Sequence, residues 1–357
     1  MRTPARLPAL DGIRALSLAM VIVAHLLNTR GLEVAPEVYF HANLGRLGVQ
    51  VFMVLSGFLI TTMLLQAYDR HGAIDLKRFY LRRAFRIFPA YYTFVALMAV
   101  GASLGWVQVN DSDLLSASLF MSGYDVERAW STGHLWSITV EEQFYLLWPW
   151  VLARWGVAGS TRVLVAVLVL APVLRVSLWL LTPIDQRLIQ EGFPTVMDAL
   201  ALGCLLAMYR QHIPRLRLFG RLQRWSWMPV VWLLLAVWTS YTWYMHTHFY
   251  AVGNTLLNVF IALFIDGAMR HRGGLGPLLN ARPVMWVGAL SYSIYLWQQP
   301  FIDRTASGTL NMFPWSVLLT LICGWLSYRL VEAPALRLRD RVVARLGKGG
   351  DEAVSAR

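Results

Sequence analysis

Ten apolar runs of roughly membrane-spanning length constrain this chain more than any other feature. A helix needs about 20 apolar residues to cross the hydrocarbon core of a bilayer. The runs cover residues 8–28, 45–67, 87–107, 135–153, 161–181, 194–209, 227–245, 251–269, 284–302 and 310–330. The run at 194–209 is short and could be tilted, broken or partly re-entrant, because sixteen helical residues span only about 24 Å. The pattern predicts an all-α polytopic membrane protein with about ten transmembrane helices.

Composition and charge agree with a membrane protein. Of the 357 residues, 57% are hydrophobic and 15% are charged, which is too apolar for an ordinary soluble domain. The net charge of +12 could suggest nucleic-acid binding, but the basic residues gather in segments between apolar runs. Cytoplasmic loops of membrane proteins collect arginine and lysine, whereas the 109–133 segment is acidic. The charges therefore predict two cytoplasmic termini, a lipid bilayer as surroundings and no nucleic-acid partner.

The cysteines and the two ends of the chain suggest a single membrane domain. Cys204 and Cys323 lie inside apolar runs, so neither a disulfide framework nor a metal site is expected. The first run is interrupted by His25 and is followed by no small-residue cleavage site, so we expect a retained helix rather than a signal peptide. Residues 1–340 should form the membrane domain, and 341–357 a basic, polar cytoplasmic tail without order.

The first apolar run contains Asp11, Arg14 and His25. Ionisable residues at membrane depth are expensive and commonly functional. In a helix, Arg14 and His25 share one face about 16 Å apart along the axis, and Asp11 lies near that face. The alternative is structural: Arg14 reaches a phosphate headgroup, and His25 is a core histidine hydrogen-bonded to a neighbouring helix.

A second unusual stretch is STGHLWSITVEEQFYLLWPW, which holds His134, Ser137, Glu141 and Glu142. Two helical turns place His134 and Glu141 on one face. A carboxylate in such apolar surroundings must be protonated, paired or facing a wet cavity, and an arginine or histidine of the first helix would be a suitable partner. The alternative is a polar pair that only locks two helices together.

A third stretch, FYLRRAFRIFPAYY, carries Arg82, Arg83 and Arg86 just before an apolar run. Arg83 and Arg86 are three residues apart, so in a helix they could grip one anionic group together. Taken alone, the motif is more often a positive-inside anchor.

A fourth stretch, LSYSIYLWQQP, places Ser291, Tyr292, Tyr295 and Trp297 on neighbouring turns. Together with His134 and Ser137, we expect Ser291, Tyr292, Tyr295 and Trp297 to line a substrate cavity, although an interfacial belt is the alternative for Trp297. In VFMVLSGFLIT, the Ser56-Gly57 pair predicts a close packing point between helices.

These motifs together resemble the acyltransferase-3 family, which contains bacterial glycan O-acetyltransferases and antibiotic acyltransferases. The matching pieces, in order, are LDGIRALSLAMVIVAH, VFMVLSGFLIT, RAFRIFP, GHLWSITVEEQFYLLWP, SYSIYLW and VEAP. The resemblance implies a ten-helix membrane protein of the bacterial inner membrane that moves an acyl group, usually acetyl, from acyl-CoA to a hydroxyl. It also implies that His25 is catalytic, that Arg14 belongs to its partner motif, and that Arg83 and Arg86 serve the donor; we expect Arg14 to bind the donor with them.

The resulting hypothesis is an O-acyltransferase with His25 as general base and with no bound cofactor, acyl-CoA being its donor substrate. Asp11 or Glu142 would orient the imidazole, and Glu141 could share the catalytic role. Some relatives carry a fused esterase-like domain that is not recognised in this sequence, so the acceptor could be a glycan, a lipid-linked sugar or a macrolide. A proton-coupled transporter is the competing class, and a membrane scaffold without chemistry is the third.

The order of Arg14 and His25 along the first helix predicts sidedness. With the N-terminus inside, His25 lies in the outer half of the bilayer, so the donor enters from the cytoplasm and the acceptor from the other side. The 111–130 loop, His246 and His248 would then help to form the acceptor vestibule, although ordinary solvated loops are the simpler interpretation of each one.

Overall fold

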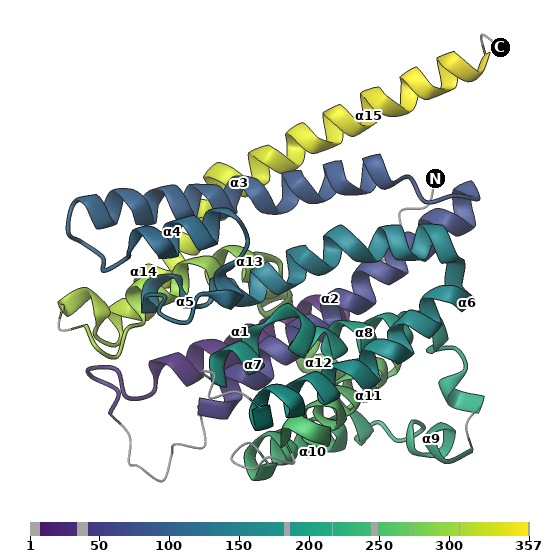
Figure 1. Cartoon of the computed structure of the whole chain (residues 1–357), viewed down its shortest axis with the longest axis horizontal. Helices are drawn as coiled ribbons and strands as arrows, with labels where there is room; N and C mark the ends of the chain where they lie inside the picture. The colour runs from purple at the N-terminus through teal and green to yellow at the C-terminus, as the bar shows by residue number, and fades with distance from the viewer. Residues whose placement is uncertain are drawn as a thin grey trace.

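The computed structural model describes residues 8–33, 42–181, 186–215, 217–243, 249–271, 273–306 and 308–355, and all regular elements in these ranges are helical (Figure 1). The longer helices are α1 (Pro8–Leu26), α2 (Ala42–His71), α3 (Leu76–Ser103), α6 (Leu135–Leu181), α8 (Phe193–Tyr209), α10 (Met228–Trp243), α11 (Asn254–Arg270), α13 (Arg282–Phe301), α14 (Trp315–Ser327) and α15 (Ala333–Ser355). The shorter ones are α4 (Asp111–Ser118), α5 (Trp130–Gly133), α7 (Gln186–Glu191), α9 (Arg217–Leu222) and α12 (Gly276–Leu279). The predicted all-α class is confirmed.

Within the described ranges, seven helices are long and apolar enough to cross a membrane. They include eight of the ten predicted runs, because the runs at 135–153 and 161–181 both lie in α6. The 227–245 run corresponds to a shorter apolar helix, Met228–Tyr241, and the 284–302 run lies in α13, whose serines and adjacent glutamines reduce its hydropathy. The chain is thus a multi-pass membrane protein, and the count of ten is not confirmed.

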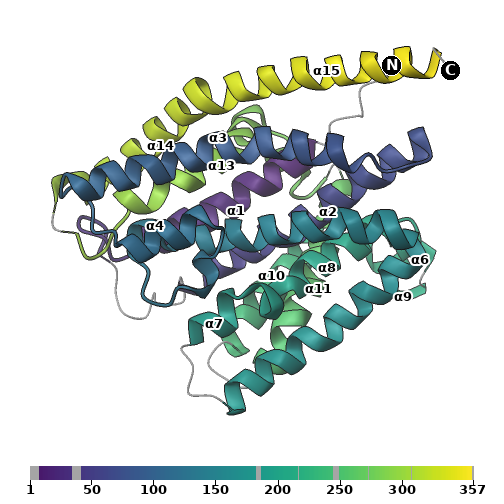
Figure 2. The same ribbon diagram turned by 45° about the horizontal axis from the view of Figure 1, so that its top comes forward.

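Helix α6 reverses its direction at Gly156, which separates its two predicted runs. Gly156 has φ of 59°, in the left-handed region that favours glycine. A Cβ added to Gly156 would meet no atom within 4 Å, so the backbone angle and not crowding explains the glycine. Figure 2 shows the two arms of α6 folded back along each other.

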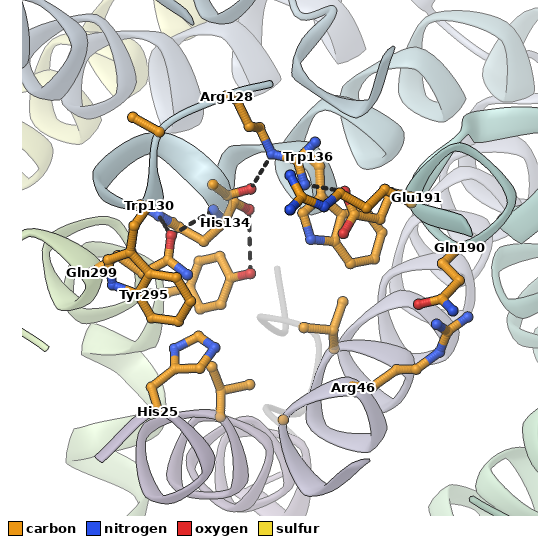
Figure 3. Close-up of a pocket in the computed structure, with 16 residues that line it drawn as sticks. His25, Arg46, Arg128, Trp130, His134, Trp136, Gln190, Glu191, Tyr295 and Gln299 are labelled. Atoms are coloured by element: carbon orange, nitrogen blue, oxygen red, sulfur yellow. Dashed lines mark hydrogen bonds and ion pairs between the residues drawn. The ribbon is translucent and has the colours of Figure 1, made fainter. Parts of the chain in front are cut away.

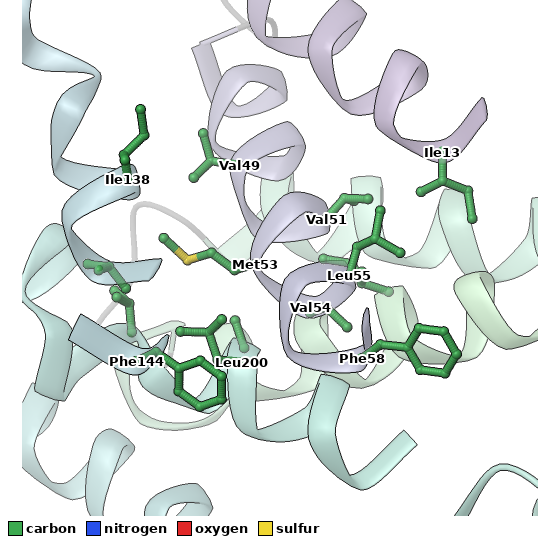
Figure 4. Packing of buried hydrophobic residues seen from close by; sticks show 14 of the residues in the cluster. Ile13, Val49, Val51, Met53, Val54, Leu55, Phe58, Ile138, Phe144 and Leu200 are labelled. Atoms are coloured by element: carbon green, nitrogen blue, oxygen red, sulfur yellow. The ribbon is translucent and has the colours of Figure 1, made fainter. Parts of the chain in front are cut away.

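Helices α1, α2, α8 and α13 form the centre of the fold, with α1 against α2 and α13, and α2 against α8. A Cβ on Gly57 would lie 2.1 Å from the carbonyl oxygen of Leu200, so only glycine permits this approach of α2 to α8. Cys204, a free and buried thiol, donates to the Gly57 carbonyl at 3.6 Å. The predicted packing point is confirmed, and Figure 4 shows Leu55, Phe58 and Leu200 in the apolar cluster around it.

Helix α15 lies beside α3 and continues to Ser355 (Figures 1 and 2). Residues 341–355 are therefore helical where the sequence led us to expect disorder. Arginine, alanine and leucine in this segment are good helix formers, and Val343 is buried. The helix thus begins in the packed body of the protein, which gives it a preformed turn from which to extend.

Candidate functional site

A cavity of about 440 Å³ lies where several helix ends meet (Figure 3). Its walls come from the second half of α1, the first turns of α2, α5 and the residues on either side of it, the start of α6, α7 and the second half of α13. The polar and aromatic residues in these walls are His25, Arg46, Arg128, Trp130, His134, Trp136, Arg187, Gln190, Glu191, Tyr295 and Gln299. Three of the predicted site residues, His25, His134 and Tyr295, therefore share one cavity.

His25 is held by an amide and an indole. Its Nδ1 lies 2.7 Å from Oε1 of Gln298, and its ring meets that of Trp130 edge-on, with centroids 5.2 Å apart. The Trp130 indole donates to the carbonyl of Ile302 at 2.8 Å, which fixes this wall. Because a carboxamide oxygen only accepts, Nδ1 carries the proton and a neutral ring keeps a lone pair on Nε2.

Nε2 of His25 is directed towards α2. A Cβ added to Gly45 would stand 4.0 Å from Nε2 and 3.0 Å from the Cβ of Ala24. Glycine at position 45 therefore leaves room beside the nitrogen that holds the lone pair, on the side of the ring that the cavity reaches.

His134 is held in a similar way by the next glutamine in sequence. Gln299 Oε1 accepts from the backbone N–H of His134 at 2.7 Å and lies 2.9 Å from its Nδ1. Tyr295 meets the His134 ring edge-on at 5.3 Å, and its hydroxyl lies 2.8 Å from that of Ser137. Two adjacent amides of α13 thus position two imidazoles.

A second polar cluster surrounds Arg83, deeper along α6. The guanidinium of Arg83 lies 3.9 Å from Glu141 and 3.5 Å from Glu142, and 3.6 Å above the centroid of the Tyr145 ring. Glu141 also accepts from the hydroxyls of Ser56 and Tyr145, both at 2.9 Å. Glu141 is five residues beyond Trp136 of the cavity wall, so the second cluster begins about 7.5 Å along α6 from that wall.

Two further arginines complete the second cluster. Arg86 is paired with Glu332, which is 1% exposed and also accepts from Ser293 at 2.8 Å. Arg14 lies 3.5 Å from Asp11 and is close enough to Arg83 and Arg86 for charge repulsion. The second cluster therefore joins α1, α3, α6 and the α14–α15 junction, where Glu332 lies.

The predicted carboxylate partner of His25 is wrong. Gln298 holds Nδ1, whereas Asp11 lies fourteen residues before His25, about 21 Å along α1, and Glu142 pairs with Arg83. The expected first-helix partner of Glu141 is also corrected, because Arg83 of α3 is its ion-pair partner and Arg14 contributes only at longer range. The order of motifs along the chain does not indicate which helices pack together. The partners of His25 and Glu141 therefore depend on the fold.

The remaining predicted residues lie around these two clusters. Arg83 and Arg86 do not share one protein partner, because Arg83 pairs with Glu141 and Glu142 whereas Arg86 pairs with Glu332. Tyr292 donates to the carbonyl of Ile87 at 3.0 Å, and Trp297 packs on Phe94. Neither is among the residues that line the cavity. Ser291 is buried. His246 and His248 lie outside the described residues.

The sequence interpretation missed Gln298, Gln299, Arg128, Glu191 and Glu332. The two glutamines follow SYSIYLW directly, and two adjacent amides in an apolar helix are a signal that could have been used. Arg128 pairs with Glu191 and donates to the carbonyls of Ser122, Asp125 and Gly133. In the sequence, both charges look like ordinary loop residues.

The chain matches the acyltransferase domain of the acyltransferase-3 family over residues 7–330. It belongs to this family. No solved structure matches it.

Curated relatives of the family extend beyond this chain. YrhL of Bacillus subtilis, whose name gives peptidoglycan O-acetyltransferase provisionally, is 30% identical over 92% of this chain and 54% of its own length. O-acetyltransferase OatA of Staphylococcus aureus is 27% identical over 98% of this chain and 60% of its own. Peptidoglycan O-acetyltransferase OatA of Listeria monocytogenes is 26% identical, with coverage of 92% and 55%. The chain thus spans little more than half the length of these relatives.

Proposed function

We propose that this chain is a membrane-embedded O-acyltransferase that moves an acyl group, with acetyl expected, from acyl-CoA to a hydroxyl of a carbohydrate or glycosylated acceptor. The observation that carries the proposal is His25 in the wall of a polar cavity, with Nδ1 held by the Gln298 oxygen. That hydrogen bond fixes the tautomer in which Nε2 can accept a proton. Membership of an acyltransferase family and the names of the relatives support the same reaction class.

In the proposed reaction, His25 acts as general base. Nε2 removes the proton of the acceptor hydroxyl while its oxygen attacks the thioester carbonyl, so a C–O bond forms as the oxygen is deprotonated. The C–S bond of the tetrahedral intermediate then breaks, and the departing thiolate takes the proton back from the imidazolium. The Gln298 oxygen, which accepts from Nδ1, keeps the ring in one orientation throughout. Restricted access of water to the cavity would protect the thioester from hydrolysis.

The second cluster is the proposed donor site. Acyl-CoA is anionic at its nucleotide end, and arginine binds phosphate with paired hydrogen bonds. Arg83 and Arg86 are held by Glu141, Glu142 and Glu332, so a phosphate would replace these carboxylates as their partner. The acyl end would then extend past Ser137 and Tyr295 towards His25.

We infer that the donor approaches from the cytoplasm, with both termini on that side, and that the acceptor approaches from the other side of the bacterial inner membrane. The arginine-rich loops support this orientation. Arg14 precedes His25 by about 16 Å along α1, which separates the donor end from the reacting end. The relatives' names point to a glycan acceptor, and lipid-linked sugars and macrolides stay open alternatives.

The direct test is CoA release by the full chain in lipid nanodiscs supplied with acetyl-CoA and a hydroxyl acceptor. Free thiol should appear only with acceptor present, and mass spectrometry should find the acetyl ester on that acceptor. The same preparation carrying His25→Ala is the matched control. Substrate accumulation in proteoliposomes without any CoA release would instead support the transporter.

A further inference from the structure

We propose that three arginines where α3 and α15 lie side by side, Arg78, Arg82 and Arg339, bind the 3′-phosphate on the nucleotide of the donor. We call these three residues the arginine row. This inference rests on the proposed function, because it extends the donor site beyond the second cluster.

The arginine row continues the second cluster along α3. Arg78, Arg82 and Arg86 are four residues apart, so they lie on one face of the helix, about 6 Å from one to the next along its axis. Arg86 belongs to the second cluster, where it pairs with Glu332. The row therefore begins one helical turn from the arginines that we assign to the donor phosphates.

Helix α15 brings the third arginine to this face. It follows Glu332 directly and lies beside α3 (Figures 1 and 2). Arg339 is about two helical turns beyond Glu332 and is close enough to Arg82 for charge repulsion. Since Glu332 meets Arg86 and Arg339 meets the turn before it, the two helices run antiparallel here.

The protein does not balance the positive charge of this face. In the described part of the chain, Arg82 has no ion-pair partner, and the buried Nε of Arg78 has no hydrogen-bond acceptor. Arg339 pairs with Asp340 at 2.8 Å. Even so, the two neighbouring arginines repel Arg82 more strongly than Asp340 and Asp75 attract it. An anion at Arg82 would thus relieve a repulsion that the folded chain maintains.

The second cluster cannot supply this positive charge, because carboxylates outnumber arginines there. Its three arginines and four carboxylates have a formal charge of −1. They are Arg14, Arg83, Arg86, Asp11, Glu141, Glu142 and Glu332. A donor with several phosphates therefore needs a further positive surface next to this cluster, and the arginine row is such a surface.

The spacing of the arginines suits the nucleotide of CoA. A phosphomonoester carries about −1.5 to −2 charges at pH 7, and arginine binds phosphate through paired hydrogen bonds. In CoA, the 3′-phosphate and the diphosphate are attached to one ribose, so one sugar ring separates them. That separation is comparable to the single turn between Arg82 and Arg86. The headgroup of a common glycerophospholipid carries one phosphodiester, which favours the nucleotide as the occupant of the row.

The test compares acetyl-CoA with acetyl-dephospho-CoA, which differ only in the 3′-phosphate. Their dissociation constants are measured by equilibrium dialysis against the full chain in phosphatidylcholine nanodiscs, without acceptor. Arg82 is exposed and Arg78 and Arg339 are half-buried, so water weakens their attraction for an anion. The 3′-phosphate should therefore tighten binding by about five- to tenfold.

Two substitutions should change this ratio of dissociation constants in opposite directions. Arg82→Gln removes an uncompensated charge and should reduce the ratio to about two- to threefold. Asp340→Asn releases Arg339 from its carboxylate and should raise the ratio by about twofold. Arg154→Gln, at an exposed arginine of α6 outside the row, is the control and should keep the ratio. All three positions are exposed, and a merely structural role would not produce opposite shifts.

The outcomes separate this inference from the proposed function. Equal dissociation constants for the two donors in the unmodified protein would overturn the inference, and CoA release would decide the proposed function by itself. A preference for acetyl-CoA without CoA release would support the nucleotide site and reject the acyltransferase. A ratio that stays unchanged in both Arg82→Gln and Asp340→Asn would also overturn the inference. Weaker binding of phosphatidylglycerol to Arg82→Gln would in that case assign the row to lipid headgroups.

Discussion

The two polar clusters differ in how their functional side chains are held. In the cavity, amide oxygens of Gln298 and Gln299 face the Nδ1 atoms of two histidines. In the second cluster, carboxylates of Glu141, Glu142 and Glu332 hold two arginines. A neutral acceptor fixes the orientation of an imidazole without adding charge, whereas a carboxylate keeps a guanidinium in place until a stronger anion replaces it.

Under the proposed function, this difference would place proton transfer in the cavity and anion binding in the second cluster. Variants in the cavity should therefore lower the rate of acyl transfer, whereas variants in the second cluster should lower the affinity for acyl-CoA.

His25→Ala should have the largest effect. Loss of a general base typically lowers the rate by about 10²–10⁴-fold, while the small cavity that it leaves is tolerated. The measurement is kcat for acetyl transfer, with the melting temperature as a check on folding. His71→Ala, at the exposed end of α2, should leave kcat unchanged. Substantial turnover by folded His25→Ala protein would remove His25 from the mechanism.

Arg86→Gln should weaken acyl-CoA binding by about 10–100-fold, because a hydrogen bond to a charged group is lost. It should also destabilise the protein by about 3 kcal/mol, since Glu332 keeps a buried charge without its counter-ion. Donor affinity is measured by equilibrium binding and stability by thermal unfolding.

The double variant Arg86→Gln/Glu332→Gln separates these two effects. Removing the buried charge should restore the melting temperature while donor affinity stays low. If the double variant bound acyl-CoA as tightly as the unmodified protein, Arg86 would have only a structural role. Arg83→Gln should likewise weaken donor binding more than it slows the bound complex.

Gln298→Leu should lower kcat by about tenfold, because the imidazole loses the hydrogen bond that fixes its tautomer. Gln298→Glu keeps an acceptor oxygen at the same place and should recover most of the activity. Equal losses in the two variants would mean that Gln298 contributes packing and does not position the ring.

Gly45→Ala should have the smallest effect on activity, a decrease of a few-fold in kcat, with some loss of stability because the added Cβ would stand 3.0 Å from the Cβ of Ala24. The new methyl group would stand 4.0 Å from Nε2 of His25, close to the path of the acceptor hydroxyl. Gly72→Ala, just beyond the far end of α2, has open space around the added Cβ but a φ of 70°, so it is strained only in its backbone and serves as a control for general destabilisation. An increase in kcat for Gly45→Ala would place the acceptor on another side of the ring.

The sequence predicted the helical class and the residue types of the site better than their pairing. Length and apolarity identify spanning helices directly, and the polar residues of α1 and α6 were informative because they are expensive in a membrane. Which residues pair depends on how the helices pack, and this packing is not evident from one sequence alone. Asp11 or Glu142 was the predicted partner of His25, whereas the structure has Gln298 there. A residue of the first helix was the predicted partner of Glu141, whereas the structure has Arg83.

Neutral and loop residues were the least predictable. Gln298 and Gln299 carry no charge, so they attract less notice than Glu141 although they position both imidazoles. Arg128 and Glu191 are far apart in sequence and resemble solvated loop charges until the fold brings them together. Three runs account for the difference between ten and seven: two of them share α6, the 227–245 run corresponds to the shorter apolar helix Met228–Tyr241, and α13 is too polar to be counted by hydropathy.

The most direct test of the division between the two clusters is the sidedness of transfer. Oriented proteoliposomes would hold acetyl-CoA on the cytoplasmic side only, with a membrane-impermeant hydroxyl acceptor offered on either side in turn. The account predicts acetylation of acceptor on the side opposite the donor, because His25 lies about 16 Å beyond Arg14 along α1. Acetylation only of acceptor that shares the donor's compartment would contradict it.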